Sequence, residues 1–159
     1  MGDKLIIFDI NGVLGKKTLN NWVIFPNIEL LFNIPKNIKV VIWSSCMMKN
    51  IKKFMIESKL KNIDTYCRKL CTSDPDGRSF DTLKPLERIW NIYPKYNKTN
   101  TVIFDDSVSK IRFNIENAIL IKDIDEKDII KNILFDIEQL ESYDDVREYV
   151  KNKNMIDVE

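Results

Sequence analysis

Histidine is absent from this chain of 159 residues, and its absence restricts the chemistry that the chain can perform. Without an imidazole there is no Ser-His-Asp or Cys-His catalysis, and there is no histidine ligand for zinc. Catalysis must therefore run on carboxylates, lysines, hydroxyl groups and, where one is bound, a metal ion.

Cysteine is scarce, with only Cys46, Cys67 and Cys71 in the chain. An odd number of cysteines and the lack of a signal peptide indicate free thiols in an intracellular compartment, either cytoplasm or nucleus. Cys67 and Cys71 have no further ligands at zinc-site spacing, so we expect no zinc site. No apolar run approaches the roughly 20 residues that cross a bilayer, so we expect no membrane association.

Neither sign of charge is in excess, because 25 lysines and arginines stand against 24 acidic residues. The basic residues are spread along the chain, so we expect no direct nucleic-acid binding. Hydrophobic residues make up 44% and charged residues 31%, as in an ordinary globular protein. The length suits one domain, and without repeats or linkers we expect a single domain over residues 1–159. The composition does not indicate an oligomeric state.

Short apolar runs alternate with helical patterns along the chain. The runs that end in polar residues predict buried parallel strands at 4–8, 40–43, 101–104 and 118–121, with a weaker candidate at 63–67. Helical spacing relates Met48, Ile51, Met55 and Ile56, then Leu83, Leu86, Ile89 and Trp90, then Ile130, Ile133, Leu134, Ile137 and Leu140, before a short last helix at 144–150. We expect loops at 15–21, 72–80 and 93–100. The alternation predicts an α/β fold with a central parallel sheet and helices on both faces.

Three expected strands end in residues that are capable of catalysis. The carboxyl ends of parallel strands meet at one edge of a sheet, where ligands bind, so we expect these residues to form one site. They are Asp9 with Asn11, Ser44 with Ser45, and Asp105 with Asp106, and Lys84 stands at the start of an expected helix.

These residue types suit phosphoryl transfer. The Asp9 carboxylate can attack phosphorus and form an acyl phosphate, which splits one difficult displacement into two easier ones. Because a carboxylate repels a phosphate dianion, a hard cation such as Mg²⁺ is needed, and Asp9, Asp105 and Asp106 offer the oxygen ligands that it prefers. The Ser44 hydroxyl and the Lys84 ammonium can hold the remaining phosphate oxygens.

Each candidate also has an ordinary structural interpretation. Asp105 and Asp106 form a polar turn in many proteins, and Ser44 is of a type that often caps a helix. Lys84 could instead be an ordinary surface lysine, and Lys69 is the other candidate for binding phosphate. The coincidence of all four features favours the phosphoryl-transfer site.

The same residues resemble the four motifs of the haloacid dehalogenase superfamily. Residues 8–14 (FDINGVL) resemble the first motif, usually Asp-x-Asp-x-(Thr/Val), and residues 43–45 (WSS) resemble the second. Lys84 within LKPLERIW resembles the third motif, and residues 104–107 (FDDS) resemble the fourth.

Within that superfamily the chain is similar to the small phosphatases of the RNA polymerase II carboxyl-terminal domain, also called NLI-interacting-factor-like phosphatases. The further similarities are at residues 25–28 (FPNI), 68–71 (RKLC), 115–118 (IENA), 138–140 (EQL) and 144–146 (DDV). The resemblance implies a three-layer Rossmann-like domain, with a reduced or absent cap insertion.

The resemblance also implies a Mg²⁺-dependent protein serine/threonine phosphatase that works through an aspartyl-phosphate. Its partner would be a phosphoprotein, with the RNA polymerase II tail as one candidate. By position, Asp9 would be the nucleophile. Asp9, the Asn11 backbone carbonyl and Asp106 would bind Mg²⁺, with Asp105 beside the ion. Ser44 and Lys84 would bind phosphate, and Arg68 would contact the substrate.

Asn11 is the main departure from that family, whose active members carry Asp there. An amide can neither protonate the leaving alkoxide nor deprotonate the attacking water, and such proton transfer is typically worth about 10²–10⁴-fold in rate. The loss should be milder for an aryl phosphate, whose phenolate leaves unaided. Two alternatives follow, a pseudophosphatase or phosphoprotein-binding module and a slow enzyme that accumulates the aspartyl-phosphate.

A second departure lies between the first two motifs. Only about 25 residues, 15–39, stand where the family has a longer insertion that folds as a β-hairpin element and shapes the substrate groove. Phe25 also replaces a basic residue of the family. Both changes bear on the substrate more than on the fold.

Overall fold

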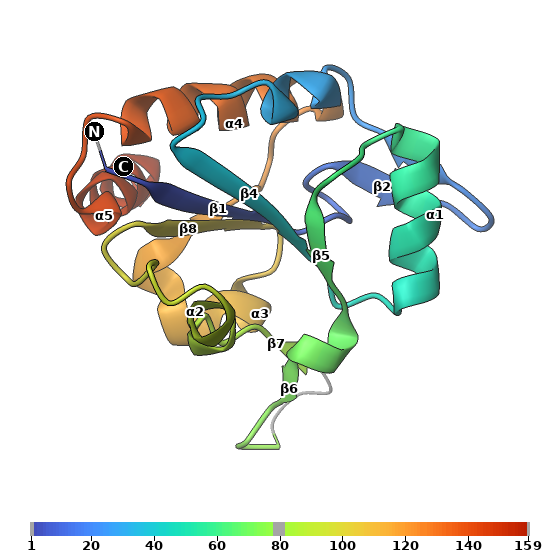
Figure 1. Cartoon of the computed structure of the whole chain (residues 1–159), viewed down its shortest axis with the longest axis horizontal. Helices are drawn as coiled ribbons and strands as arrows, with labels where there is room; N and C mark the ends of the chain where they lie inside the picture. Colours follow the sequence, from blue (N-terminus) through green and yellow to red (C-terminus); the bar gives the residue numbers. More distant parts are fainter. Residues whose placement is uncertain (1, 78–81, 159) are drawn as a thin grey trace.

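A five-stranded parallel sheet forms the centre of the computed structural model, which describes residues 2–77 and 82–158 (Figure 1). Its strand order is β5-β4-β1-β8-β9, with all neighbours parallel. The strands are β1 (Lys4–Phe8), β4 (Ile38–Trp43), β5 (Asp64–Tyr66), β8 (Thr101–Asp105) and β9 (Ala118–Leu120). The predicted α/β class and parallel sheet are confirmed, with ends that differ by one or two residues.

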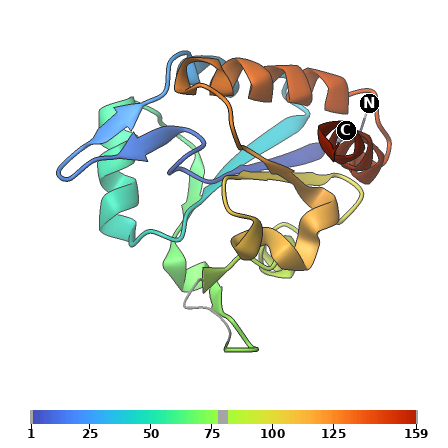
Figure 2. The same cartoon turned by 180° about the vertical axis from the view of Figure 1, so that it is seen from behind.

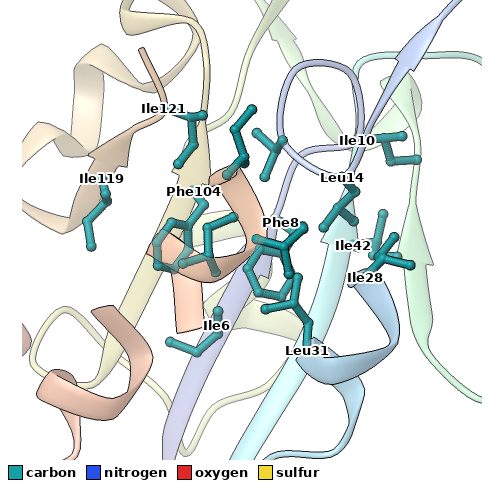
Figure 3. Packing of buried hydrophobic residues seen from close by; sticks show 14 of the residues in the cluster. Ile6, Phe8, Ile10, Leu14, Ile28, Leu31, Ile42, Phe104, Ile119 and Ile121 are labelled. Atoms are coloured by element: carbon teal, nitrogen blue, oxygen red, sulfur yellow. The ribbon is translucent and has the colours of Figure 1, made fainter. Parts of the chain in front are cut away.

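Alternate residues of the central strand build two cores, one on each face of the sheet. Ile6 and Phe8 face a cluster that includes residues of α1, α4 and α5, whereas Leu5 and Ile7 face residues around α2 and α3. Figure 3 shows the first cluster, in which Phe8 and Phe104 from neighbouring strands have ring centroids 5.5 Å apart. This burial on both faces explains why the strands read as continuous apolar runs.

Helices cover both faces, so the molecule has the three layers that the sequence predicts (Figure 1). The α-helices are α1 (Met48–Ser58), α2 (Glu87–Ile92), α3 (Val108–Ile111), α4 (Glu126–Leu140) and α5 (Val146–Val158), and the 3-10 turns are η1 (Ile28–Phe32), η2 (Arg68–Leu70) and η3 (Arg112–Asn117). Within the described residues, none of these helices has both the length and the apolar character to span a membrane.

Two helix predictions need correction. In α1 the fully buried residues are Ile51 and Phe54, while Ile56 of the expected stripe is 77% exposed. The face of α1 that packs on the core is therefore the one that carries Ile51 and Phe54. The apolar pattern did not predict this face, because Met55 and Ile56 are also apolar. The last helix runs from Val146 to Val158 and is longer than the expected 144–150.

The stretch 15–21 is not the loop that we expected. Strand β2 (Gly15–Lys17) pairs antiparallel with β3 (Trp22–Ile24), and Trp22 packs edge-on against Phe54 of α1 with ring centroids 5.5 Å apart. A short hairpin thus occupies the place of the family's longer insertion.

A second hairpin pairs β6 (Thr72–Ser73) with β7 (Thr82–Leu83), so the expected loop 72–80 begins with a strand and its residues 78–80 lie outside the described part. Leu83 of the second expected helical stripe lies in β7, before α2 begins. Figure 2 shows the first hairpin beside α1 and the second projecting from the molecule.

Candidate active site

Three polar strand ends meet at the carboxyl edge of the sheet. Phe8 pairs in register with Ile42 on one side and Phe104 on the other, so the residues that follow them emerge side by side. Strand order reverses direction at β1, and this switch point is where open α/β sheets bind ligands. The strand ends therefore lie together as expected, because the parallel strands pair in register.

Asp9, Asp105 and Asp106 lie close enough to share a metal ion. One carboxylate oxygen from each lies within 4.8 Å of the others. Asp9 and Asp105 are buried, whereas Asp106 is exposed. Hard carboxylate oxygens are the ligands that Mg²⁺ prefers, so the residues present fit this ion. The set would be Asp9, Asp106 and the Asn11 carbonyl, with Asp105 beside them, as the resemblance implies.

Lys84 lies between two of these carboxylates and is not a surface lysine. Its Nζ is 2.7 Å from Asp105 Oδ2 and 3.2 Å from Asp9 Oδ1, and its side chain is fully buried. It precedes α2, held by a hydrogen bond from its backbone N–H to the Lys110 carbonyl. Lys69, the competing candidate, is exposed in η2.

The charges of this cluster perturb one another. Burial raises the pKa of Asp9 to about 7, with Asp105 and Asp106 adding to the rise and Lys84 opposing it. Burial and the neighbouring Asp105 also raise the pKa of Asp106. Burial alone would lower the pKa of Lys84, but Asp9 and Asp105 outweigh it and hold that pKa above its ordinary value. Lys84 pairs with two of the three carboxylates, so the cluster keeps an excess of negative charge that a cation would relieve.

The loop after β1 is built so that Asp106 can approach it. The Ile10 N–H donates to Asp9 Oδ1 over 2.8 Å, and the Ile10 carbonyl accepts from the N–H groups of the residues that close the loop. Gly12 has φ +86°, and a Cβ atom there would lie 2.2 Å from Asp106 Oδ2. Only glycine fits this position, which sequence reasoning did not single out. A glycine directly after the Asp-x-Asn sequence was the available signal.

Gly12→Ala is expected to displace the Asp106 carboxylate and weaken Mg²⁺ binding by about tenfold or more. The control is Gly77→Ala, since Gly77 also has positive φ (+64°) but a Cβ atom there would have no neighbouring atom within 4 Å. Calorimetric titration with Mg²⁺ measures the effect. Equal Mg²⁺ affinity in wild type and Gly12→Ala would show that Asp106 is not a ligand.

Asn11 connects the nucleophile loop to the first hairpin. Its side chain is exposed, and its Oδ1 accepts the backbone N–H of Lys17 at 3.1 Å. Since the amide oxygen is engaged with β2, the amide NH₂ is the group available toward a ligand.

Ser44 and Ser45 line the neighbouring strand end. Ser44 is buried and its Oγ accepts the Cys46 N–H at 3.1 Å, so it shapes the turn but does not cap α1, whose N-cap residue is Met47. Arg68 is exposed, and its Nε donates to the Ser45 carbonyl at 2.9 Å. The structure therefore places Ser44 at the carboxyl end of β4, the strand that pairs with β1, and Arg68 in contact with the turn at Ser45.

Lys110 is a cation of this region that sequence reasoning missed. Its Nζ donates to Ser45 Oγ at 2.7 Å, and its charge acts to lower the pKa of Asp106. The available signal was its position four residues after Asp106, one helical turn onward in α3. Lys110 thus adds positive charge at the mouth of a site whose carboxylates outnumber Lys84.

Comparison with known proteins relates this chain to a family. The family model of the NLI interacting factor-like phosphatases matches residues 27–147, which include Ser44, Lys84 and the Asp105-Asp106 pair. Asp9 and Asn11 lie before the matched stretch.

Two curated relatives are similar over most of the chain. The ubiquitin-like domain-containing CTD phosphatase of Arabidopsis thaliana is 30% identical over 134 residues, covering 76% of this chain and 39% of the relative. The ubiquitin-like domain-containing CTD phosphatase 1 of Xenopus tropicalis is 27% identical over 138 residues, covering 76% of this chain and 42% of the relative. The chain thus spans about two fifths of the length of these relatives. The matched stretch exceeds half of the chain, and the chain belongs to the NLI interacting factor-like phosphatase family.

Proposed function

We propose that the chain is a Mg²⁺-dependent phosphomonoester phosphatase that acts on phosphorylated side chains of proteins through an aspartyl-phosphate. The observation that carries the proposal is the carboxylate cluster of Asp9, Asp105 and Asp106 around the buried Lys84 at the carboxyl edge of the sheet. Family membership and the names of the relatives support a phosphoprotein substrate.

Phosphoserine and phosphothreonine are the substrates that the resemblance implies, and the RNA polymerase II tail is one candidate partner. The free thiols of Cys46, Cys67 and Cys71 accord with an intracellular location in cytoplasm or nucleus.

The first step is a displacement at phosphorus by Asp9. The Ile10 N–H, bonded to Asp9 Oδ1, orients this carboxylate, and Lys84 and the Ser44 hydroxyl hold the non-bridging phosphate oxygens. When bound, Mg²⁺ would offset the repulsion between the carboxylates and the phosphate dianion. The P–O bond to the leaving group breaks, and its electron pair stays on the leaving oxygen.

The second step is attack of water on the aspartyl-phosphate, which releases inorganic phosphate and restores Asp9. In both steps a carboxylic acid at position 11 would move a proton, and the Asn11 amide cannot. Asn11 is therefore the observation that favours the alternative function, a pseudophosphatase that binds a phosphoprotein without turnover.

Phosphate release from an aryl phosphate and from a phosphoserine peptide, with and without Mg²⁺, tests the proposal. We expect Mg²⁺-dependent release that disappears in Asp9→Asn, and an intact-mass increase of one phosphoryl group when hydrolysis of the phosphoenzyme is slow. Release that persists in Asp9→Asn would remove Asp9 from the mechanism. Neither release nor a mass increase, with phosphopeptide binding intact, would establish the binding module.

The pKa of Asp9 makes Mg²⁺ affinity dependent on pH. Because this pKa is raised to about 7, Asp9 is protonated below that pH in the metal-free protein, and the proton must leave before the ion binds. We expect affinity for Mg²⁺ to rise between about pH 5.5 and pH 8 and then to level off. Titration calorimetry measures this, and the Asp9→Asn variant should lose most of the rise. A pH-independent affinity in the wild type would contradict the prediction.

A further inference from the structure

A pocket of about 370 Å³ opens directly beside the nucleophile loop. Asn11, Gly12 and Asp106 line the side toward the carboxylate cluster. Its floor is apolar and consists of the buried Phe25, Ile121 and Ile129 and the half-buried Ile124. The pocket is thus continuous with the candidate site and differs from it in chemistry.

Two lysines stand at the mouth of the pocket. Lys16 of β2 and Lys122 after β9 are both exposed, and Lys16 reaches Glu126 of α4 across 3.8 Å. That exposed ion pair is weak and holds the mouth only loosely. Asp123 and Glu126 line the pocket beside these lysines, so its mouth carries both signs of charge.

The lining residues place this pocket on the leaving-group side of the reaction. In the proposed mechanism, residue 11 stands where a proton donor would meet the leaving oxygen, and Asn11 lines this pocket. The residues assigned to the non-bridging phosphate oxygens, Ser44 and Lys84, do not belong to its lining within the described chain. A group that departs from phosphorus opposite Asp9 would therefore enter this space.

The chemistry at position 11 suits an aromatic leaving group. A tyrosine hydroxyl has a pKa of about 10, so its phenolate departs without a proton, unlike a serine or threonine alkoxide. With its oxygen bonded to the Lys17 N–H, the Asn11 amide can donate a hydrogen bond to that phenolate through its NH₂ group. An apolar floor favours a planar ring over a short aliphatic chain.

Building on the proposed function, we infer that this pocket holds the aromatic ring of an aryl phosphomonoester, phosphotyrosine in a protein, and that such esters are the preferred substrates. Asp9 attacks phosphorus, the bond from phosphorus to the phenolic oxygen breaks, and the phenolate takes its proton from solvent after departure. Water then attacks the aspartyl-phosphate, and inorganic phosphate leaves with Asp9 restored.

Two peptides of one sequence, differing only in phosphotyrosine or phosphoserine, test the preference in the presence of Mg²⁺. We expect kcat/KM to be higher for the phosphotyrosine peptide by about 10²-fold or more. Equal or faster turnover of the phosphoserine peptide would overturn the inference and leave the proposed function standing. Failure of every donor to release phosphate or to phosphorylate Asp9 would instead defeat the proposed function.

A variant that fills the pocket tests whether the pocket binds the ring, separately from the fact that a phenolate is a better leaving group than an alkoxide. Ile124→Trp is expected to lower kcat/KM for the phosphotyrosine peptide by about tenfold, while phosphorylation of Asp9 by acetyl phosphate, which has no ring, changes less than about twofold. Phe135→Trp, on an exposed position of α4, is the matched control. An equal loss with both donors, or no loss with either, would overturn the assignment of the pocket.

Lys122→Glu provides a second test on an exposed residue, where a substitution leaves the packing of the core intact. It places a negative charge at the mouth where the phenolate develops, so it is expected to lower kcat/KM for the phosphotyrosine peptide. An unchanged kcat/KM for the peptide would contradict the inferred position of the ring.

Discussion

Asn11→Asp is expected to raise kcat/KM on a phosphoserine peptide by about 10²–10⁴-fold, because it restores a group that can move protons. The alkoxide of serine is a poor leaving group and gains most from a proton donor. An aryl phosphate, whose phenolate leaves unaided, should gain far less. The difference between the two substrates is thus the signature of the missing acid.

The structure indicates that Asp fits at this position without rebuilding the loop. Asp and Asn have nearly the same shape, and a carboxylate oxygen can accept the Lys17 N–H that now bonds to Asn11 Oδ1. The other oxygen would then be available to the leaving group. Asn20→Asp, an exposed change of equal charge in the same hairpin, is the control.

Initial rates of phosphate release from both substrates measure the effect of Asn11→Asp. A folded variant that remains inert on both substrates would show that the missing acid is not the whole explanation. The binding-module function would then take first place.

Lys84→Met is expected to lower the free energy of unfolding by about 3–5 kcal/mol near pH 8 in the absence of Mg²⁺. Lys84 is fully buried between Asp9 and Asp105, and its removal leaves two buried carboxylates without their cation. The methionine retains much of the volume, so the loss comes mainly from uncompensated charge. Lys69→Met, at an exposed lysine of η2, should have little effect.

The direction of the pH dependence follows from Asp9. Its pKa is raised by burial to about 7 in the folded state, above the unfolded value of 3.8, so stability falls as pH rises between these two values and levels off above pH 7. Because Lys84 lowers this pKa, its removal extends the fall in stability to higher pH. The deficit of Lys84→Met should therefore shrink near pH 5.5, where Asp9 is protonated. Adding Asp9→Asn to Lys84→Met should likewise recover part of the stability near pH 8. Urea denaturation of the single and double variants measures both, and a pH-independent deficit with no recovery would contradict this role of Asp9.

Local patterns were sufficient for the sheet. The central strands begin and end near the predicted residues because they are buried on both faces and must be continuously apolar, as 5–8 and 102–104 are. The stripe of Ile130, Ile133 and Ile137 predicted α4 for a similar reason, since one face of that helix meets the core. Where apolar residues occur on several faces, as in α1, the pattern does not tell which one is inward.

The two hairpins were missed because their stability is not local. The β2–β3 hairpin has three-residue strands whose pattern is weak, and it is held by Trp22 packing on Phe54, a contact between residues 32 positions apart. Such pairs depend on the placement of α1, which no window of sequence contains.

The sequence by itself determined the chemistry that is available: no imidazole, one carboxylate at the end of the first strand, a pair at the end of the fourth strand of the sheet, and Asn11 in the place of an acid. The tertiary structure decided how those groups act on one another. Burial sets the pKa of Asp9, Lys84 becomes the cation of the cluster, and Gly12 is required by the approach of Asp106. Proximity and desolvation, which arise only when distant segments pack, are the physical reason for the difference.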